Sequence, residues 1–185
     1  VSSTNSTGQV KITDREVTFT DIEKALNMSK TMKVPNDKTL LYALPNEYLV
    51  DGQNGITDPL GMSGIKLEAR SHLIHCSKNT KENILKCIRS ISKSLTVTNF
   101  YFNQLGVAEV ILSEEQKKLG VCLIDIGAGT TDISVYKNGS IFFSKVLPYA
   151  GDYVTERIAL ALDIPQSDAE KIKKKYGCAF SDIAS

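Results

Sequence analysis

The segment that decides the fold reads Val121-Cys122-Leu123-Ile124-Asp125-Ile126-Gly127-Ala128-Gly129-Thr130-Thr131-Asp132-Ile133-Ser134-Val135-Tyr136. Before the glycines the residues are almost all apolar, as in a strand buried on both faces, and after them apolar and polar residues alternate. The segment therefore predicts a strand, a tight loop and a second strand. An Asn138-Gly139 turn follows, which predicts a hairpin and a third strand over residues 141–146.

The loop over residues 127–131 has the composition of a phosphate-binding loop. Glycine lets the backbone approach a ligand closely, so successive N–H groups can face phosphate oxygens, and the two threonines add hydroxyl donors. Asp125, at the end of the strand, is suited to hold Mg²⁺ through water, because Mg²⁺ keeps several waters and takes few protein ligands. The dinucleotide and Walker patterns do not fit, since Asp132 replaces the third glycine and no lysine is present. A plain hairpin connection remains an alternative.

Composition and charge narrow the class of protein. The chain has 185 residues, 42% of them hydrophobic and 23% charged, which is typical of a soluble globular protein. Its net charge of +1 gives no overall field for nucleic acid or an anionic membrane. No apolar stretch is long enough to span a bilayer, and we expect an intracellular protein. The chain begins with Val1 close to a strand pattern, and we expect a fragment of a longer protein.

Cysteine and histidine give no sign of catalysis or metal binding. The four cysteines are irregularly spaced in apolar patterns, which indicates reduced core thiols. His72 and His75 lie in a segment of period two, so we expect them on opposite faces of a sheet, where they could not share a metal.

The first part of the chain reads as a small α+β unit. Thr20 and Glu23 form a capping box that opens a short helix. We expect strands at 9–13, 39–44, 47–50 and 65–76. The glycine-rich connection 52–64 is too long for a simple hairpin turn and is a candidate contact loop. The inward residues of the helix are Ile22, Ala25 and Leu26.

Helical spacing becomes common after residue 79, which indicates a boundary and an α/β layer. We expect helices at 80–92 and 105–112, a strand at 96–102, and a short helix capped by Ser113 and Gln116 that ends at Gly120.

The last part predicts two helices behind the loop. Gly151 lets the chain turn close to a bound ligand, and the helix that follows has a stripe of Val154, Ile158 and Leu162. Glu170 and Lys173 share a face of the final helix and could hold ribose hydroxyls and adenine edges. A capping box with Ser167 explains Glu170 equally well.

These motifs together resemble the FtsA-type family of bacterial cell-division proteins, which belong to the actin-like ATPase superfamily. Residues 125–132 are similar to the second phosphate motif shared by that superfamily. The other matching stretches are Leu44-Pro45-Asn46-Glu47-Tyr48, Asp58-Pro59-Leu60-Gly61-Met62-Ser63-Gly64, Val146-Leu147-Pro148-Tyr149-Ala150-Gly151 and Ser167-Asp168-Ala169-Glu170-Lys171-Ile172-Lys173. The stretches at 58–64 and 167–173 narrow the resemblance to the division family.

The resemblance implies an α/β chain that is a fragment of the actin-like (ribonuclease H-like) ATPase fold, with an inserted α+β 1C (SHS2-like) subdomain. Residues 1–78 then correspond to the 1C-like subdomain, 79–117 to the returning part of subdomain 1A, and 118–185 to the start of subdomain 2A. It also implies ATP and Mg²⁺ as cofactors, Mg²⁺ being held by Asp125 through water, and no catalytic residue. The implied nucleotide-binding residues are Asp125, Gly127, Ala128, Gly129, Thr130, Thr131, Gly151, Glu170 and Lys173.

The implied function is an ATP-gated scaffold at the inner face of the cell membrane at the division site. The 1C-like region would serve self-association and contacts with later division proteins. Contacts with the tubulin-like division-ring protein and with the membrane would use regions absent here, the latter a C-terminal amphipathic helix. We expect at most a weak ATPase in the complete protein, and weak ATP binding without hydrolysis in this chain. A sugar-kinase-type phosphotransferase, a pilus-assembly or cell-shape relative, and a pure interaction module remain alternatives.

One residue departs from the family pattern. Ala128 stands where the family often has glycine. If its φ is positive, the added methyl group costs about 1 kcal/mol and weakens nucleotide binding modestly.

Overall fold

The computed structural model describes residues 1–31 and 34–179 of the chain, so the end of the expected 118–185 segment lies outside the described residues. The chain forms two compact units. Unit 1 contains Val1–Leu123 with Ser134–Lys145, and unit 2 contains Ile124–Ile133 with Val146–Ser185. The division crosses the three strands predicted around the glycine loop and the Asn138-Gly139 turn, so the glycine loop belongs to unit 2.

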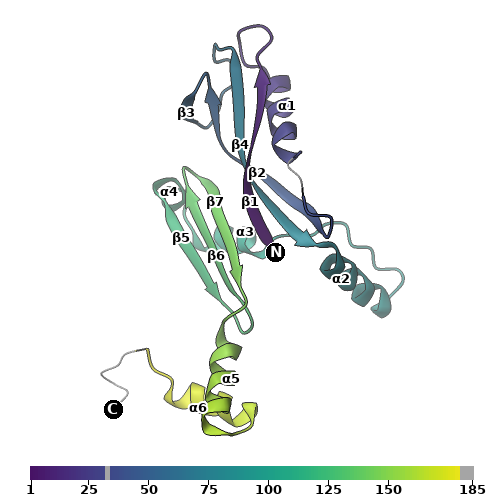
Figure 1. Ribbon diagram of the computed structural model, residues 1–185, viewed down its shortest axis with the longest axis vertical. Coiled ribbons are helices and arrows are strands. Elements are labelled where there is room, and N and C mark those ends of the chain that lie inside the picture. Colours follow the sequence, from purple (N-terminus) through teal and green to yellow (C-terminus); the bar gives the residue numbers. More distant parts are fainter. Residues whose placement is uncertain (32–33, 180–185) are drawn as a thin grey trace. The chain divides into compact units, whose positions relative to one another are not determined.

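A four-stranded antiparallel sheet and one helix form the N-terminal part of unit 1 (Figure 1). Helix α1 packs against β1 and β4, and the core between them contains Ile12, Val17, Ala25, Tyr48, Val50, Leu67 and Ala69. The strand order is β1-β4-β2-β3, and the elements are β1 (Ser2–Lys11), α1 (Phe19–Lys30), β2 (Lys38–Val50), β3 (Gln53–Ile56) and β4 (Lys66–Ser77). Of the residues expected to face inward from α1, Ala25 is fully buried, and Ile22 and Leu26 are partly buried against this core. This α+β arrangement is the one the sequence predicted.

Helix α1 lies unusually close to β1 at Gly8. A Cβ added there would clash with the carbonyl oxygen of Ala25 and the backbone nitrogen of Ser29. Glycine is required at this position because the helix backbone occupies the space of a side chain.

Four details of this region differ from the sequence prediction. The strand expected at 9–13 is the longer β1, which begins at Ser2 and ends at Lys11. Helix α1 is capped by Thr18 and Asp21 rather than by Thr20 and Glu23, because aspartate at the third helical position closes the capping box equally well. The two strands expected at 39–44 and 47–50 are one strand, β2, and the register shift between Pro45 and Glu47 accommodates the proline. The expected contact loop 52–64 begins with a short strand, β3.

Helices joined by irregular segments follow β4 in unit 1. It contains α2 (Lys78–Ile91), α3 (Asn103–Ile111) and α4 (Glu114–Leu119). The strand expected at 96–102 is not formed; the segment is instead held by the Tyr42 hydroxyl, which donates to the Phe100 carbonyl at 3.3 Å, and by burial of Phe102. The capping box of Ser113 and Gln116 at α4 is confirmed.

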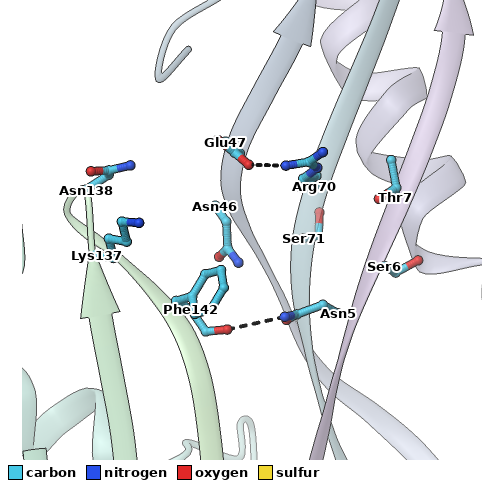
Figure 2. Close-up of a pocket in the computed structure, with 10 residues that line it drawn as sticks. All are labelled: Asn5, Ser6, Thr7, Asn46, Glu47, Arg70, Ser71, Lys137, Asn138 and Phe142. Atoms are coloured by element: carbon cyan, nitrogen blue, oxygen red, sulfur yellow. Dashed lines mark hydrogen bonds and ion pairs between the residues drawn. The ribbon is translucent and has the colours of Figure 1, made fainter. Parts of the chain in front are cut away.

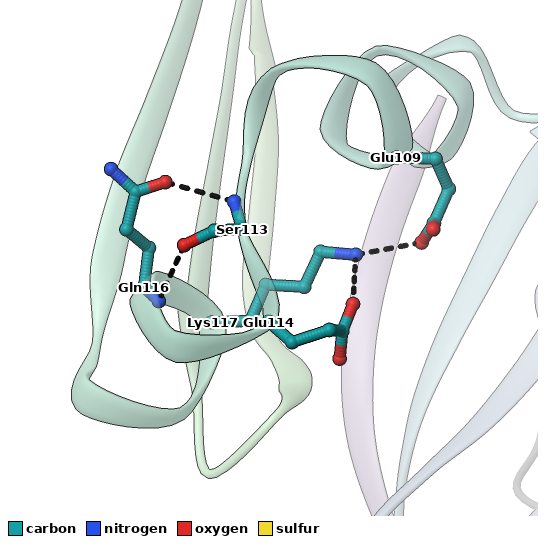
Figure 3. Close-up of polar contacts among 5 residues, drawn as sticks. All are labelled: Glu109, Ser113, Glu114, Gln116 and Lys117. Carbon is teal, nitrogen blue, oxygen red and sulfur yellow. Dashed lines mark hydrogen bonds and ion pairs between the residues drawn. The ribbon is translucent and has the colours of Figure 1, made fainter.

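Lys117 on α4 is buried and paired with two carboxylates. Its Nζ lies 2.9 Å from Glu109 and 3.0 Å from Glu114, whose side chains remain largely exposed (Figure 3). These hydrogen bonds raise the pKa of Lys117 despite its burial. The ion pairs therefore fix α4 against α3 with no unpaired buried charge.

A three-stranded meander follows, made of β5 (Val121–Ile126), β6 (Thr131–Lys137) and β7 (Ser140–Leu147). Asn138 and Gly139 both have positive φ, as the predicted two-residue turn requires. Leu123, Tyr136 and Ile141 form a second core with Ala108 of α3. The prediction that β5 is buried on both faces is wrong: Ile124 and Ile126 are exposed, because the described residues cover only the Leu123 face.

Unit 2 adds two helices that pack on each other, α5 (Gly151–Leu162) and α6 (Gln166–Tyr176). The expected stripe of Val154, Ile158 and Leu162 is not the buried face of α5. Thr155 and Ala159 are the buried residues of α5, whereas Val154 and Leu162 are about half exposed. Small side chains at the contact, including the fully buried Ala169 of α6, let the two helices approach closely.

Two further expectations concern cysteine location and membrane spans. Cys76 is buried, whereas Cys87, Cys122 and Cys178 are exposed, so the prediction of core thiols is wrong for these three. Within the described residues, no helix combines the length and the apolar character needed to cross a bilayer.

Candidate functional site

The loop between β5 and β6 turns without left-handed backbone. The Gly127 N–H donates to the Thr130 carbonyl at 2.9 Å and closes the turn. Neither Gly127, Ala128 nor Gly129 has a positive φ. The strain anticipated for Ala128 therefore does not arise, and its methyl group has no conformational cost here.

Three consecutive backbone N–H groups of this loop have no hydrogen-bond acceptor among the described residues. Within the part of the chain that the structure describes, the amides of Ala128, Gly129 and Thr130 donate to no protein acceptor. A Cβ added at Gly129 would meet no atom within 4 Å. The loop thus presents unpaired donors beside open space, which is what binding of an anionic group through backbone amides requires.

The loop is tied to the start of α5 by backbone hydrogen bonds. The N–H groups of Gly151 and Asp152 donate to the carbonyls of Gly127 and Ala128 at 3.1 and 2.7 Å. Helix α5 has no side-chain N-cap, so these loop carbonyls satisfy its first amides. The expectation that Gly151 lies close to a bound ligand stays a prediction.

Thr131 has a structural contact in this arrangement. Its hydroxyl donates to the Tyr149 carbonyl at 2.7 Å, so its single proton is already used. Thr130 is less constrained, because its hydroxyl lies 3.5 Å from Asp132 Oδ2. Of the two threonines, Thr130 is the better hydroxyl donor for a ligand.

Two carboxylates flank the loop. Asp125 is partly buried at the end of β5, and Asp132 is partly buried at the start of β6. Burial raises the pKa of Asp132, and the charge of Asp125 raises it further. Two acids that repel each other beside unpaired amides suit a hydrated divalent cation. The sequence led us to expect Asp125 alone, although Asp132 stands in the same motif.

The described residues contain no group of three or more His, Cys, Asp or Glu side chains placed to hold a metal. Any cation here would keep most of its ligands as water or ligand oxygens, as Mg²⁺ does.

Glu170 and Lys173 meet behind the loop. Lys173 Nζ lies 2.6 Å from Glu170 Oε2 and 3.0 Å from the Gly151 carbonyl oxygen. Lys173 and Thr155 lower the pKa of Glu170 to about 2 by hydrogen bonding to its carboxylate. Thr155 was not identified from the sequence, because a threonine within a helix has no distinctive pattern.

The capping explanation of Glu170 is wrong. Helix α6 begins at Gln166 after Pro165 and has no side-chain cap, so Ser167 lies inside the helix and Glu170 faces α5. The Glu170 carboxylate is therefore committed to this cluster rather than to the helix end.

A cavity of about 260 Å³ adjoins the loop in unit 2. It is lined by Gly129, Pro148, Asp152, Tyr153, Thr155, Glu156 and Gln166. This volume is smaller than that of most complete ligand sites, and is appropriate for part of a nucleotide.

Unit 1 contains a larger cavity, of about 530 Å³, between its sheet and the tip of the β6–β7 hairpin (Figure 2). Two charged residues that line it, Glu47 and Arg70, form an ion pair with each other at 2.5 Å. Most of its lining residues lie in strands rather than in a turn with consecutive unpaired amides. The smaller cavity in unit 2 is therefore the better candidate for phosphate binding.

Two family models match the chain. Residues 1–75 match the model described as the SHS2 domain inserted in FTSA, and residues 122–185 match the model of cell division protein FtsA. Between them the two models cover most of the chain.

Curated relatives match over the whole chain. The cell division protein FtsA of Pseudomonas aeruginosa is 45% identical over 184 residues, which is 100% of this chain and 44% of that protein. The protein of the same name from Escherichia coli K12 is 40% identical over 183 residues, 99% of this chain and 43% of that protein. The chain therefore spans less than half the length of the curated relatives it matches.

A chain of the PilM-PilN type IV pilus biogenesis complex has a similar structure. The TM-score is 0.59 at 19% identity, over 95% of this chain and 48% of that chain. At this identity the similarity concerns the fold alone.

Proposed function

This chain belongs to the FtsA family of cell-division proteins, and we propose that it supplies the phosphate-binding half of a nucleotide site to an actin-like scaffold of the division apparatus. The expected actin-like α/β fold with an inserted SHS2 subdomain is confirmed. The relatives do not favour a sugar kinase or a pilus-assembly protein, because the sequence matches are to FtsA.

The unpaired amides of Ala128, Gly129 and Thr130 are the observation that carries this proposal. Three adjacent N–H groups beside open space leave a site for an anion that no described protein group fills. Their position is fixed by the hydrogen bonds from Gly151 and Asp152 to the loop carbonyls. The nucleotide phosphates would bind to these amides, with Thr130 as an additional donor.

ATP with Mg²⁺ is the proposed ligand. Asp125 would hold the hydrated Mg²⁺, and Asp132 would share that role, since burial and then the charge of Asp125 raise the pKa of Asp132 and a cation would favour its charged form. Gly151 and Glu170 complete the chain's side of the site, and Lys173 supports Glu170. With half a site, we expect weak ATP binding and no measurable hydrolysis by this chain alone.

The wider role is part of the same proposal. We place the 1C-like subdomain at 1–78, the returning part of subdomain 1A at 79–117 and the start of subdomain 2A at 118–185. The 1C-like subdomain would mediate self-association and contacts with later division proteins. The complete protein would link the tubulin-like division ring to the inner face of the cell membrane, through regions outside this chain.

Isothermal titration calorimetry of the full-length protein with Mg-ATP tests the proposal. Gly129→Val places a branched side chain where the protein itself has room, so any loss of binding reflects exclusion of the ligand. Gly106→Val is the matched control, because a Cβ at Gly106 also meets no atom within 4 Å but lies in α3. We expect ATP binding to be lost with Gly129→Val and Asp125→Ala and kept with Gly106→Val. Unchanged binding in the first two variants would leave the loop purely structural and favour an interaction module.

A further inference from the structure

Strand β1 is an edge strand whose outer side is open. In the sheet order β1-β4-β2-β3 it has β4 on one side, and no strand of the described residues pairs with its other side (Figure 2). Its register with β4 is unbroken from Ser2, opposite His75, to Lys11, opposite Lys66. The strand therefore presents a continuous row of backbone groups, without the bulges that commonly blunt an edge.

The hydrogen-bond pattern identifies which residues of β1 point outward. The Ile12 N–H donates to the Ile65 carbonyl at 2.8 Å, so the pairing with β4 continues through Ile12. Hydrogen-bonded residues alternate along an antiparallel strand, so the even-numbered residues of β1 bond to β4. The backbone N–H and C=O groups of the odd-numbered residues face away from β4. These residues are Ser3, Asn5, Thr7, Gln9 and Lys11.

This edge lacks the other common protective devices. Residues 2–10 contain no charged side chain and no proline, and Asn5, Thr7 and Gln9 are exposed. The opposite edge of the sheet is protected, because β3 covers the end of β2 and the remainder of β2 contains Pro45 and two register shifts. Strand β1 is thus the side of the sheet to which a further strand can be added.

The sequence of β1 is complementary to itself in an antiparallel pair. A two-fold axis at Thr7 places this residue opposite Thr7 of a second copy, and it places Asn5 opposite Gln9. The threonine hydroxyls and the two side-chain amides can then hydrogen-bond across the pair, and no charged side chain faces another. An axis at Ser6 would give up both of these side-chain pairs.

Helix α1 leaves room for the second copy. Its Ser29 touches both neighbouring strands, because a Cβ at Gly8 of β1 would clash with the Ser29 backbone nitrogen and the Ser29 hydroxyl donates to Ser71 of β4 at 2.9 Å. Helix α1 therefore lies above β1 and β4 together. Since adjacent strands are about 4.8 Å apart, the α1 helices of two paired copies would lie about 10 Å apart, a normal distance for packed helices.

Met28 of α1 adds an apolar contact near the same axis. Its backbone lies against Gly8, the residue after Thr7. Ile22 and Leu26 point from α1 into the core, so Met28, rotated by about 200° from Leu26, projects from the flank of α1 on the open side. Its side chain is half exposed, at 52%. Packing Met28 of one copy against Met28 of the other would remove both side chains from water.

We propose that the open edge of β1, together with Met28, is an interface through which two copies of the chain pair their β1 strands antiparallel about Thr7. The two four-stranded sheets then form one continuous sheet. The proposal rests on the proposed self-association of the 1C-like subdomain and names the surface that performs it. It involves neither the glycine loop nor a nucleotide.

Cysteine cross-linking tests the register of this pairing. The exposed cysteines are first replaced by serine: Cys87, Cys122 and Cys178. In that background Thr7→Cys should form a disulfide-linked dimer under mild oxidation, because the two residues of a hydrogen-bonded pair have Cα atoms about 5.5 Å apart. Gln9→Cys is the matched control on the same edge, and it should not cross-link because it lies about 14 Å from its own copy. Mixing Gln9→Cys with Asn5→Cys should restore the linked dimer.

Sedimentation equilibrium measures the reversible association of the chain. We expect a monomer–dimer equilibrium, and Thr7→Lys should weaken it about fivefold, because like charges then face each other at the axis. Gln53→Lys, on β3 at the opposite edge, is the matched control and should leave the dimerisation constant unchanged. A melting curve followed by circular dichroism establishes that each variant is folded.

The two measurements separate this inference from the proposed function. A dimer in which Thr7→Cys and Gln9→Cys cross-link equally would overturn the pairing about Thr7 and leave self-association in place. A chain that stays monomeric would overturn the inference and the proposed self-association together, and would leave the edge to an extended segment of another protein. Neither result depends on ATP binding, which the calorimetry of the Gly129→Val variant tests separately.

Discussion

Acidification is expected to destabilise unit 1 through His72. This histidine on β4 is almost completely buried and joins β1 to β7. Its Nδ1 donates to Asn5 Oδ1 at 2.6 Å, and its Nε2 accepts from the Ser144 hydroxyl at 2.9 Å. The neutral ring satisfies both partners, and burial, helped by the charge of His75, lowers the pKa of His72 to about 4.

The sign and size of the effect follow from this depressed pKa. The unfolded chain takes up the proton near pH 6.5, whereas the folded chain resists it until about pH 4. The stabilisation is therefore complete above pH 6.5 and is lost as the pH falls toward 4. A shift of this size corresponds to about 3 kcal/mol in all, of which about 2 kcal/mol is lost by pH 5.

Urea unfolding at a series of pH values measures the loss. His72→Gln removes the titrating group while keeping an amide to pair with its neighbours, so its unfolding free energy should be lower at pH 7 but flatter between pH 6.5 and 5. His75→Gln measures the share of the pH slope that comes from the second histidine, whose pKa is also lowered, chiefly by burial. A pH slope that His72→Gln leaves unchanged would refute the account of His72.

Three further variants test the packing and the charges described above. Gly8→Val should lower the unfolding free energy by about 3 kcal/mol in urea titrations, because α1 must move away from β1; an unaffected midpoint would contradict the close contact. Lys117→Met should cost about 1 kcal/mol, since Glu109 and Glu114 return to water, and Lys117→Ala should cost about 2 kcal/mol more through lost packing; equal losses would argue against a packing role. Asp132→Asn should stabilise the chain at neutral pH without Mg²⁺, because the folded state raises the pKa of this acid and so disfavours its charged form. That advantage should shrink when Mg²⁺ is added, and its persistence would argue against a cation at Asp132.

Local sequence signals predicted much of the fold. The change from an apolar run to alternation at Gly127, together with the Asn138-Gly139 turn, was enough to predict the three strands of the meander. The capping box at Ser113 was equally clear, because each of these signals depends on residues within a few positions of one another.

Signals that depend on distant partners failed. The 96–102 segment has strand-forming residues but finds no neighbouring strand in the described part of the chain, and packing of Phe102 determines its path instead. The stripe on α5 was assigned to Val154 rather than to Thr155, because periodicity shows that a helix has a buried face without showing which neighbour selects it.

The sequence by itself determined the glycine loop, the acid before it and the family to which the chain belongs, since these are encoded in contiguous residues. Tertiary structure alone decided that the Thr131 hydroxyl donates to the Tyr149 carbonyl and that Asp132 lies close enough to Asp125 to feel its charge. It also decided that Thr155 and Lys173 both contact the Glu170 carboxylate. The physical reason is that a hydrogen bond depends on distance and direction in space. Residues far apart in the chain acquire both only when the helices pack.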